Sequence, residues 1–476
     1  MKTIFAALLL ILTSLNLFAD DSALADEGEG SYNYFLYLQP LAGSELRTVA
    51  VGGAVNDSMD QAVEQSLEYT ILERDNSSAV VRLANPEPEL VVQVSNPEYQ
   101  DRILRLVAAN PLDLMPTSLN FAILSPKNTS HQFEAAWPTG IQPKSVTFIS
   151  NTLVAIPLLA DRGIDIIDIT DGSTRRIAPP AAWARHQGFV ESLVLPQRGE
   201  LWVSQMTTAA IHVFDLQTLA YKLTIPTGGS WSKVLAYNPV LDRVFFTHWL
   251  SEDVSIINPY TYKEERRADY KAVPRGLTFS ADGQSMYLAQ YEVAGRSAGR
   301  VLKVDLVNLE VSATMGVAGA KRHIVKDQAR GLMYVSDMAR NIIEVFSLTT
   351  DRLLHAIPVS AKPNTIQLSP DGRRLYVSCR GPNNPTLDYL YKGLEMGKVH
   401  IVDTATFQVV ETHEGGNQPT GLDISPDGRR LVFSDFLDKR IRVYLRTPAS
   451  RGTPRRGAEW LNRRSGMAAA TLPIML

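Results

Sequence analysis

The chain has 476 residues, of which 45% are hydrophobic and 20% are charged, so it is long enough to bury a large core. Its formal net charge of -3 excludes a generally basic protein that coats nucleic acid, and a nucleic-acid partner is not indicated. Cys379 is the single cysteine, which excludes an intrachain disulfide and predicts a buried free thiol.

The N-terminus has the pattern of a secretory signal peptide, in which Lys2 precedes an apolar run over residues 4–18. This run is too short for a membrane span, and no later run of about 18 apolar residues exists, so no transmembrane segment is expected. Small residues allow cleavage after Ala25 or after Ala19, and we assign residues 1–25 to the signal peptide. We therefore expect an exported protein, either periplasmic or at the cell surface and beyond.

Residues 32–127 are predicted to form a small β-sandwich-like domain, because β-rich runs alternate there with turn signals. This segment contains no motif for chemistry, and its role is structural or partner docking. Residues 58–66 are expected to form one or two helical turns. The expected strands cover residues 32–38, 46–51, 67–72, 79–83, 90–94 and 103–107.

A hairpin sequence recurs along the rest of the chain and organises it. Ser425-Pro426-Asp427-Gly428 is followed by an apolar strand, and related sequences begin at Ser369 and Ser280. Proline fits the first corner of a type I turn and glycine accepts a left-handed backbone, so each copy predicts a β-hairpin. A hairpin that recurs at similar long intervals indicates a repeat protein.

Aligned on this hairpin, residues 131–447 divide into seven four-strand units, which predicts a seven-bladed β-propeller. The last unit lacks its fourth strand, and residues 131–137 are predicted to supply it and so close the ring. The predicted fold class is thus all-β, a seven-bladed β-propeller with a small N-terminal β-sandwich-like domain. Residues 448–476 form a basic tail that is expected to be disordered, with an anionic surface or partner as the alternative. The units open near Gln142, Phe189, Ser230, Pro274, Lys321, Pro363 and Pro419.

Residues 418–433, residues 362–378 and residues 399–404 resemble the YVTN β-propeller repeat of YncE-like exported proteins. Tyr334-Val335-Ser336-Asp337 and Tyr376-Val377-Ser378-Cys379 come nearest to the tetrapeptide of that family. The resemblance covers about residues 131–447. It implies the fold and an exported location, and it says little about activity.

The mouth of the central channel is the predicted functional face. Loops that enter the inner strands emerge there, together with the loops between second and third strands, which are long at residues 291–300 and 380–398. Cations gather around this opening, and large side chains such as Trp249 and Tyr291 follow the second strands. The alignment places one residue of each unit at the start of its inner strand: Lys144, Glu191, Ser232, Arg275, Arg322, Asn364 and Thr420.

We expect non-catalytic binding or scaffolding at this face, with an anionic small molecule, a glycan or a protein as the partner. The alternatives are packing of these side chains between blades, a lactonase-type hydrolase, or the propeller subunit of a periplasmic redox enzyme. No catalytic residue, metal ligand or cofactor is predicted; His186, His248 and His323 could meet only if their loops converged. The candidate ligand-binding residues are Lys144, Lys233, His248, Trp249, Arg275, Tyr291, Arg322, His323, Arg380, Tyr389 and Tyr391.

Overall fold

The computed structural model describes residues 32–447 except for 50–62, 68, 75–77, 86–89, 107, 109–119, 125–128 and 394. The predicted signal peptide and the basic tail lie outside the described residues. Within the described ranges, no helix is long and apolar enough to cross a membrane.

The N-terminal residues form two four-stranded sheets that pack face to face. Tyr34, Leu36 and Leu38 alternate along one strand and Val92 and Val94 along another, so each sheet turns one apolar face toward the shared core. One sheet contains, in spatial order, β4 (Thr70–Arg74), β5 (Ala79–Asn85), β1 (Tyr32–Gln39) and β8 (Asn120–Ile123). The other contains β3 (Val63–Ser66), β2 (Glu45–Val49), β6 (Leu90–Asn96) and β7 (Tyr99–Leu106).

Two local predictions for this domain were wrong, and one strand was missed. Residues 63–66 form β3 rather than the end of a helix. This polar segment shows no apolar alternation, and it is a strand because it pairs with the edge of β2. The expected strand at 67–72 begins only at Thr70. The parallel strand β8 was not predicted; it pairs with β1 from a segment of only four residues.

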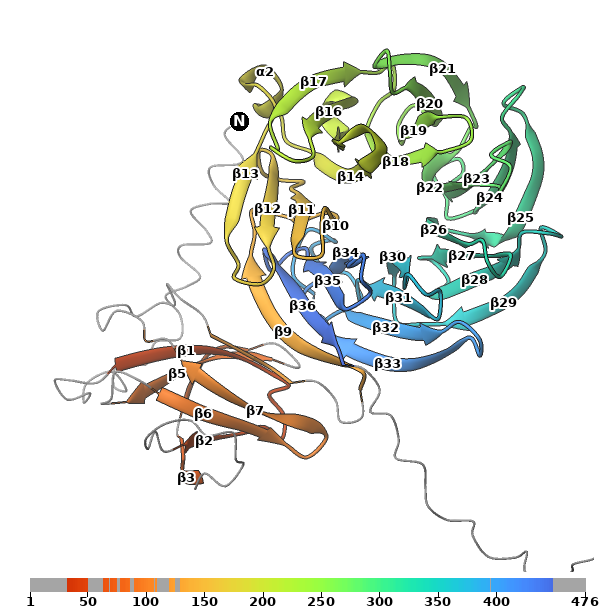
Figure 1. Ribbon diagram of the computed structural model, residues 1–476. Coiled ribbons are helices and arrows are strands. Elements are labelled where there is room, and N and C mark those ends of the chain that lie inside the picture. Colours follow the sequence, from red (N-terminus) through yellow and green to blue (C-terminus); the bar gives the residue numbers. More distant parts are fainter. Residues whose placement is uncertain are drawn as a thin grey trace, which may run out of the picture.

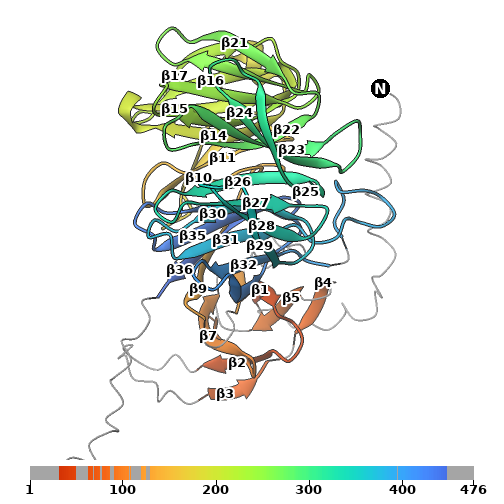
Figure 2. The same cartoon turned by 90° about the vertical axis from the view of Figure 1, so that its right-hand side faces the viewer.

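Seven four-stranded sheets follow in a ring, which confirms the predicted fold class (Figures 1 and 2). Among the described residues, three short helical segments lie outside the sheets: α2 (Ala181–Ala184), η3 (Pro196–Arg198) and η4 (Met206–Thr208). The first three sheets consist of β10 (Thr147–Phe148), β11 (Leu153–Pro157), β12 (Ile164–Asp168) and β13 (Thr174–Ile177); β14 (Phe189–Leu195), β15 (Glu200–Gln205), β16 (Ala210–Asp215) and β17 (Tyr221–Pro226); and β18 (Ser232–Asn238), β19 (Arg243–His248), β20 (Asp253–Asn258) and β21 (Lys263–Asp269).

The next three sheets consist of β22 (Val273–Phe279), β23 (Ser285–Glu292), β24 (Gly299–Asp305) and β25 (Val311–Gly319); β26 (Lys321–Asp327), β27 (Leu332–Asp337), β28 (Ile342–Ser347) and β29 (Leu353–Pro358); and β30 (Pro363–Leu368), β31 (Arg374–Cys379), β32 (Lys398–Asp403) and β33 (Gln408–Glu414). Within each sheet the strands follow one another in chain order. The fully buried Cys379 ends β31.

The seventh sheet combines both ends of the propeller, as the sequence predicts. It contains β34 (Pro419–Ile424), β35 (Arg430–Asp435), β36 (Arg440–Arg446) and β9 (His131–Pro138). The antiparallel pairing of β36 with β9 extends from Arg446 opposite His131 to Arg440 opposite Pro138. The chain that enters the propeller therefore closes the ring at its last blade.

The recurring hairpin forms the predicted turn. The Ser425 hydroxyl donates to Asp427 Oδ1 at 2.6 Å, the Gly428 N–H donates to the Ser425 carbonyl at 2.8 Å, and Gly428 has φ +71°. Gly372 and Gly283 adopt the same left-handed backbone in the related hairpins. These turns join the inner strand of a blade to its second strand, at the ends opposite those that line the channel mouth.

The N-terminal domain packs against the seventh blade (Figure 1). Arg442 is fully buried; it donates to Asp435 and, through Nη1, to Gln39 Oε1 of β1 at 2.6 Å. The Arg440 guanidinium lies 4.8 Å from the centre of the Tyr37 ring. Polar and cation–π contacts therefore tie β1 to the last strand of the propeller.

We predict that ring closure depends on β9 itself. A chain that begins at residue 140, behind a restored signal peptide, should lose more than about 3 kcal/mol of unfolding free energy, because burial of Phe133 alone contributes about 3–5 kcal/mol. A chain that begins at residue 129 keeps β9 and is the control. Thermal unfolding of both measures the difference, and equal Tm values would contradict the role of β9.

Candidate functional site

A β-bulge recurs near the start of the inner strand in six of the seven propeller sheets. In β18, for example, the pairing with β19 shifts between Ser232 and Leu235, and the other five inner strands shift at the equivalent place. A bulge bends its strand and re-aims a side chain. Two residues in each of these strands are thereby turned out of the regular alternation, next to the channel.

Hydroxyl groups hold five of these six bulges in place. The N–H of the second bulge residue donates to a Ser or Thr of the neighbouring strand, as in His323 to Ser336 at 3.0 Å. The Ser336 hydroxyl in turn donates to the Asn364 carbonyl of the next blade at 2.9 Å. We call this pair of bonds the hydroxyl clamp. The bond to the bulge N–H also forms in Glu191 to Ser204, Val234 to Thr247, Thr365 to Ser378 and Gly421 to Ser434.

Where the first bulge residue is a cation, its side chain lines a cavity at the channel mouth. In the first sheet Lys144 follows the bridge residue Pro143, so it takes the equivalent place. Four of the seven equivalent residues are cations. The residues are Lys144, Val190, Lys233, Arg275, Arg322, Asn364 and Thr420.

The structure corrects two members of the ring that the sequence predicts. Glu191 lies one position beyond the ring, which Val190 occupies instead. The Ser232 side chain bonds to His248, and Lys233 takes its place in the ring. Alignment on hairpins placed both one residue off, because a bulge shifts the register without leaving a signal in the sequence.

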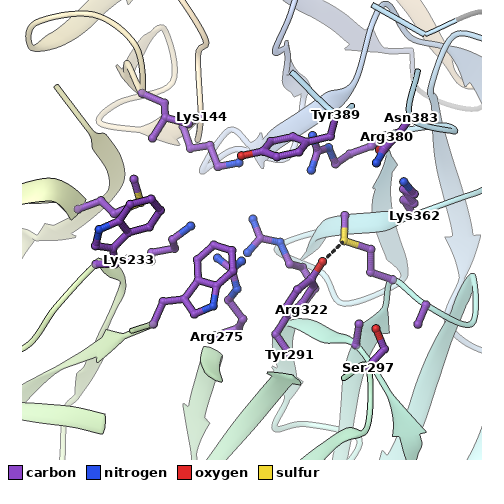
Figure 3. Close-up of a pocket in the computed structure, with 17 residues that line it drawn as sticks. Lys144, Lys233, Arg275, Tyr291, Ser297, Arg322, Lys362, Arg380, Asn383 and Tyr389 are labelled. Atoms are coloured by element: carbon purple, nitrogen blue, oxygen red, sulfur yellow. Dashed lines mark hydrogen bonds between the residues drawn. The ribbon is translucent and has the colours of Figure 1, made fainter. Parts of the chain in front are cut away.

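The mouth holds a cavity of about 320 Å³, near the lower end of the range for ligand pockets (Figure 3). Six cationic side chains and no carboxylate are among the residues that line it. Aromatic side chains form much of the remaining wall. The cations are Lys144, Lys233, Arg275, Arg322, Lys362 and Arg380, and the aromatic residues are Trp231, Trp249, Tyr291 and Tyr389.

Aromatic faces, rather than carboxylates, hold several of these cations. The Arg275 guanidinium lies 4.0 Å from the centre of the Trp249 ring and 4.8 Å from that of Tyr291. The Lys233 ammonium lies 3.9 Å from the Trp249 ring centre. Cation–π contact stabilises a charge without neutralising it. Arg275 is 4% exposed, and its Nε and Nη1 have no hydrogen-bond partner among the described residues.

Arg380 and Lys144 are held in a similar way on the opposite side of the cavity. The Arg380 guanidinium lies 5.3 Å from the Tyr389 ring centre, and it also donates to Gln418 Oε1. The Lys144 ammonium lies 4.9 Å from the Phe436 ring centre. These side chains approach the cavity together with Tyr389 (Figure 3).

Burial and mutual repulsion lower the proton affinity of the cations. Burial holds the pKa of Lys144 and of Lys233 well below the ordinary 10.5, and nearby arginines lower both further. Burial also lowers the pKa of Arg380 to about 10. Glu191 interacts with this cluster; burial raises its pKa, and the surrounding cations oppose that rise. Glu292 likewise interacts with Arg275, and Asp388 interacts with Arg380. The site therefore carries a concentrated positive charge whose neighbouring carboxylates lie outside the cavity lining.

Eight of the eleven predicted site residues line this cavity, and three do not. His248 is fully buried, with Nδ1 2.5 Å from the Ser232 hydroxyl and Nε2 2.6 Å from that of Ser255. Burial lowers the pKa of His323 to about 4, and its side chain does not line the cavity. Tyr391 is 53% exposed and lies outside it. The three histidines His186, His248 and His323 are not part of any group of described residues that could hold a metal ion.

Trp231 and Lys362 line the cavity but were not predicted. Both have left-handed backbones, with φ +56° and +59°, and both directly precede an inner strand. Their position before Ser232 and Pro363 is the signal that could have identified them, because the entry loop of each inner strand faces the mouth.

Three similarities to known proteins bear on this chain. A family model described as lactonase, a seven-bladed β-propeller, matches residues 261–459. Antigen Lp49 of Leptospira interrogans serogroup Icterohaemorrhagiae serovar copenhageni is 46% identical over 391 residues, which cover 80% of this chain and 84% of that protein. A chain of Kuenenia stuttgartiensis hydrazine synthase has a TM-score of 0.54 at 15% identity, covering 65% of this chain and 97% of that one. At this identity the last similarity shows the fold alone.

We predict that the hydroxyl clamp positions the cations. Ser336→Ala should reduce the unfolding free energy by about 1–3 kcal/mol, because it leaves a buried N–H and a buried carbonyl without their partner. Ser312→Ala on the exposed strand β25 is the control. Denaturant unfolding measures the loss, and a Ser336→Ala protein as stable as the control would refute the clamp.

Proposed function

The chain belongs to the family of Antigen Lp49, and from this premise we propose that it is an exported β-propeller that binds a small, multiply charged anion without catalysis. One observation carries the proposal, namely the cavity at the channel mouth that six cations and no carboxylate line. We also propose that the chain is a YncE-like member of the YVTN group. The same proposal includes a periplasmic or surface location and domain boundaries at residues 25, 127 and 447. The antigen name of the relative and the leader-like N-terminus support export.

Charge pairing elsewhere in the chain indicates that the unpaired cations serve a ligand. Lys321, directly before Arg322, is fully buried and pairs with Asp337 at 2.6 Å and Glu344 at 2.8 Å. That arrangement is typical of a structural buried lysine. Four of the cavity cations, Lys144, Lys233, Arg275 and Arg380, lie over aromatic rings instead, and Arg322 donates to the neutral Asn364 amide, which leaves their charge available. An anion that entered the cavity would relieve the repulsion between them.

Arginine geometry indicates the kind of anion. The unpartnered Nε and Nη1 of Arg275 lie on different edges of its planar guanidinium, so each can donate to a separate oxygen of a ligand. Carboxylate and phosphate-type oxyanions offer several accepting oxygens, and Arg322 and Arg380 add further donors. We therefore infer a ligand with at least two negative charges on carboxylate or phosphate-type groups.

The size of the cavity favours a small molecule over a glycan or a protein. A volume of about 320 Å³ suits a compact metabolite. The loop that carries Tyr389 is bonded to itself, since Asn384 Nδ2 donates to the Lys392 carbonyl at 2.9 Å, and to the seventh blade through Gly393 N–H and Asn417 Oδ1 at 3.1 Å. Such a loop forms a defined wall, as a small ligand requires.

Hydrolysis of a lactone is the second candidate function, because the lactonase model matches residues 261–459. The cations would then stabilise the developing oxyanion, and Glu191, which interacts with these cations although it does not line the cavity, is the candidate base. A redox role has no comparable support. The hydrazine synthase chain is only 15% identical, so its similarity concerns the fold and not the activity.

We predict that Arg275→Met weakens anion binding about 10- to 100-fold, since a charge-assisted hydrogen bond contributes about 1.5–3 kcal/mol. Calorimetric titration of the purified protein with sulfate, pyrophosphate and citrate measures the loss. Thermal stability should not fall, because the substitution removes repulsion while keeping similar volume.

Arg266→Met, an exposed arginine of β21, is the matched control and should bind like the parent. Equal anion affinities of Arg275→Met and the parent would refute the proposal. Turnover of a lactone panel that Glu191→Gln abolishes would instead establish the second candidate function.

We also predict that sulfate binding takes up protons. The lysine pKa values are lowered in the free protein, and a bound dianion raises them again, so affinity should decrease as pH rises from neutrality toward 10.5. Sulfate itself does not titrate in this range. Calorimetry in two buffers of different ionisation enthalpy measures the proton uptake. A binding enthalpy that is the same in both buffers throughout this range would contradict it.

A further inference from the structure

A second polar cluster lies outside the cavity, at the outer seam between the sixth and seventh blades. It contains His131 of β9 and both Glu411 and His413 of β33. The three side chains are 1%, 9% and 1% exposed. One nitrogen or oxygen atom from each lies within 4.8 Å of the others. Residues more than 270 positions apart in the chain thus converge on one buried point.

The separations between these atoms are close to those of metal ligands. His413 Nε2 lies 2.7 Å from Glu411 Oε1, and His131 Nδ1 lies 3.2 Å from the same oxygen. Tetrahedral ligands that are about 2.0–2.1 Å from zinc lie roughly 3.3 Å from one another. Small side-chain shifts would therefore make room for an ion between the three groups.

Neighbouring groups orient the carboxylate and one of the two rings. His131 Nε2 lies 3.0 Å from the Tyr376 hydroxyl, so a proton on Nε2 leaves Nδ1 free as a ligand. Glu411 accepts three hydrogen bonds from the chain that enters β9: from Ser130 N–H at 3.1 Å, from its hydroxyl at 2.9 Å and from His131 N–H at 2.9 Å. The carboxylate is thus well supplied with donors before either imidazole is counted.

Other buried histidines of the propeller have a simpler environment. His400 on β32 lies 2.9 Å from the Thr412 hydroxyl and 2.8 Å from that of Ser360. His212 on β16 lies 2.9 Å from Thr224 and 2.9 Å from the amide oxygen of Gln205. A neutral partner satisfies each of these rings, whereas His131 and His413 converge on one carboxylate that already has three donors.

We propose that His131, Glu411 and His413 bind a divalent transition metal, with Zn²⁺ as the ion that best fits two imidazoles and one carboxylate. The site joins β9, which closes the ring, to the outermost strand of the preceding blade. The ion enters when β9 opens locally or before the ring closes, because the site is buried. Metal binding then stabilises the closed ring. This proposal is independent of the anion site.

The test uses the full mature chain without an affinity tag, first treated with a chelator. Titration with Zn²⁺ should show one ion per chain and a Tm that rises with zinc concentration. His413→Asn should weaken zinc binding by at least about 100-fold, since loss of even an orienting neighbour costs 10- to 100-fold. His400→Asn, a buried histidine on the adjacent strand, is the matched control and should bind zinc like the parent.

X-ray absorption of the zinc-loaded parent provides a readout that does not depend on a variant that folds. Two imidazole nitrogens with oxygen in the remaining positions are expected. A parent that binds no zinc, a His413→Asn protein that binds zinc like the parent, or a ligand shell without two imidazoles would each overturn the proposal.

Discussion

The pairing of β9 with β36 is the constraint on which the rest of the structure depends. Seven sheets in a ring bury their faces against neighbours only if the ring is complete, and this pair completes it. The chain reaches β9 directly from the N-terminal domain, whose Gln39 accepts a hydrogen bond from Arg442 of the same blade. Ring closure and domain docking therefore share one sheet.

A closed ring also brings residues from distant parts of the chain to one opening. Lys144 and Arg380 are more than 200 positions apart and line the same side of the cavity, both over the Phe436 ring. Their separation within the cavity follows from the arrangement of the blades, and the hydroxyls of Ser204, Ser336 and Ser378 each bond to the backbone of the next blade. Aromatic rings complete the arrangement, because they support cations without cancelling their charge. The result is a rigid site whose charge is not balanced internally.

The sequence was sufficient to predict the fold and eight of the 17 residues that line the cavity. Repetition of the Ser-Pro-Asp-Gly hairpin reveals the phase of the blades, and the phase identifies residues such as Arg275, Arg322 and Trp249. The sequence did not predict the positions of Glu191 and Ser232 relative to the ring correctly. A bulge shifts the side chains by one position, and neither composition nor periodicity indicates where a bulge occurs.

Side-chain contacts between blades could not be predicted from the sequence either. His131 and His413 each occupy an ordinary place in an outer strand, and they meet because two outer strands lie side by side. No spacing along one element signals such a pair. His248 was assigned to the mouth for a related reason, since the direction of its side chain depends on the neighbouring Ser232 and Ser255.

In the hydroxyl clamp, one residue fixes the backbone of the bulge and a different residue faces the channel. The hydroxyl that fixes a bulge belongs to the second strand, and in Ser336 it bonds to the backbone of its own inner strand and of the next blade's inner strand. The first bulge side chain takes no part in this bonding, so Val190, Asn364 and Thr420 occupy the same place as Lys233 and Arg275 without a change in backbone pairing. Ligand preference can therefore diverge among relatives by single substitutions at this ring while the propeller itself stays the same.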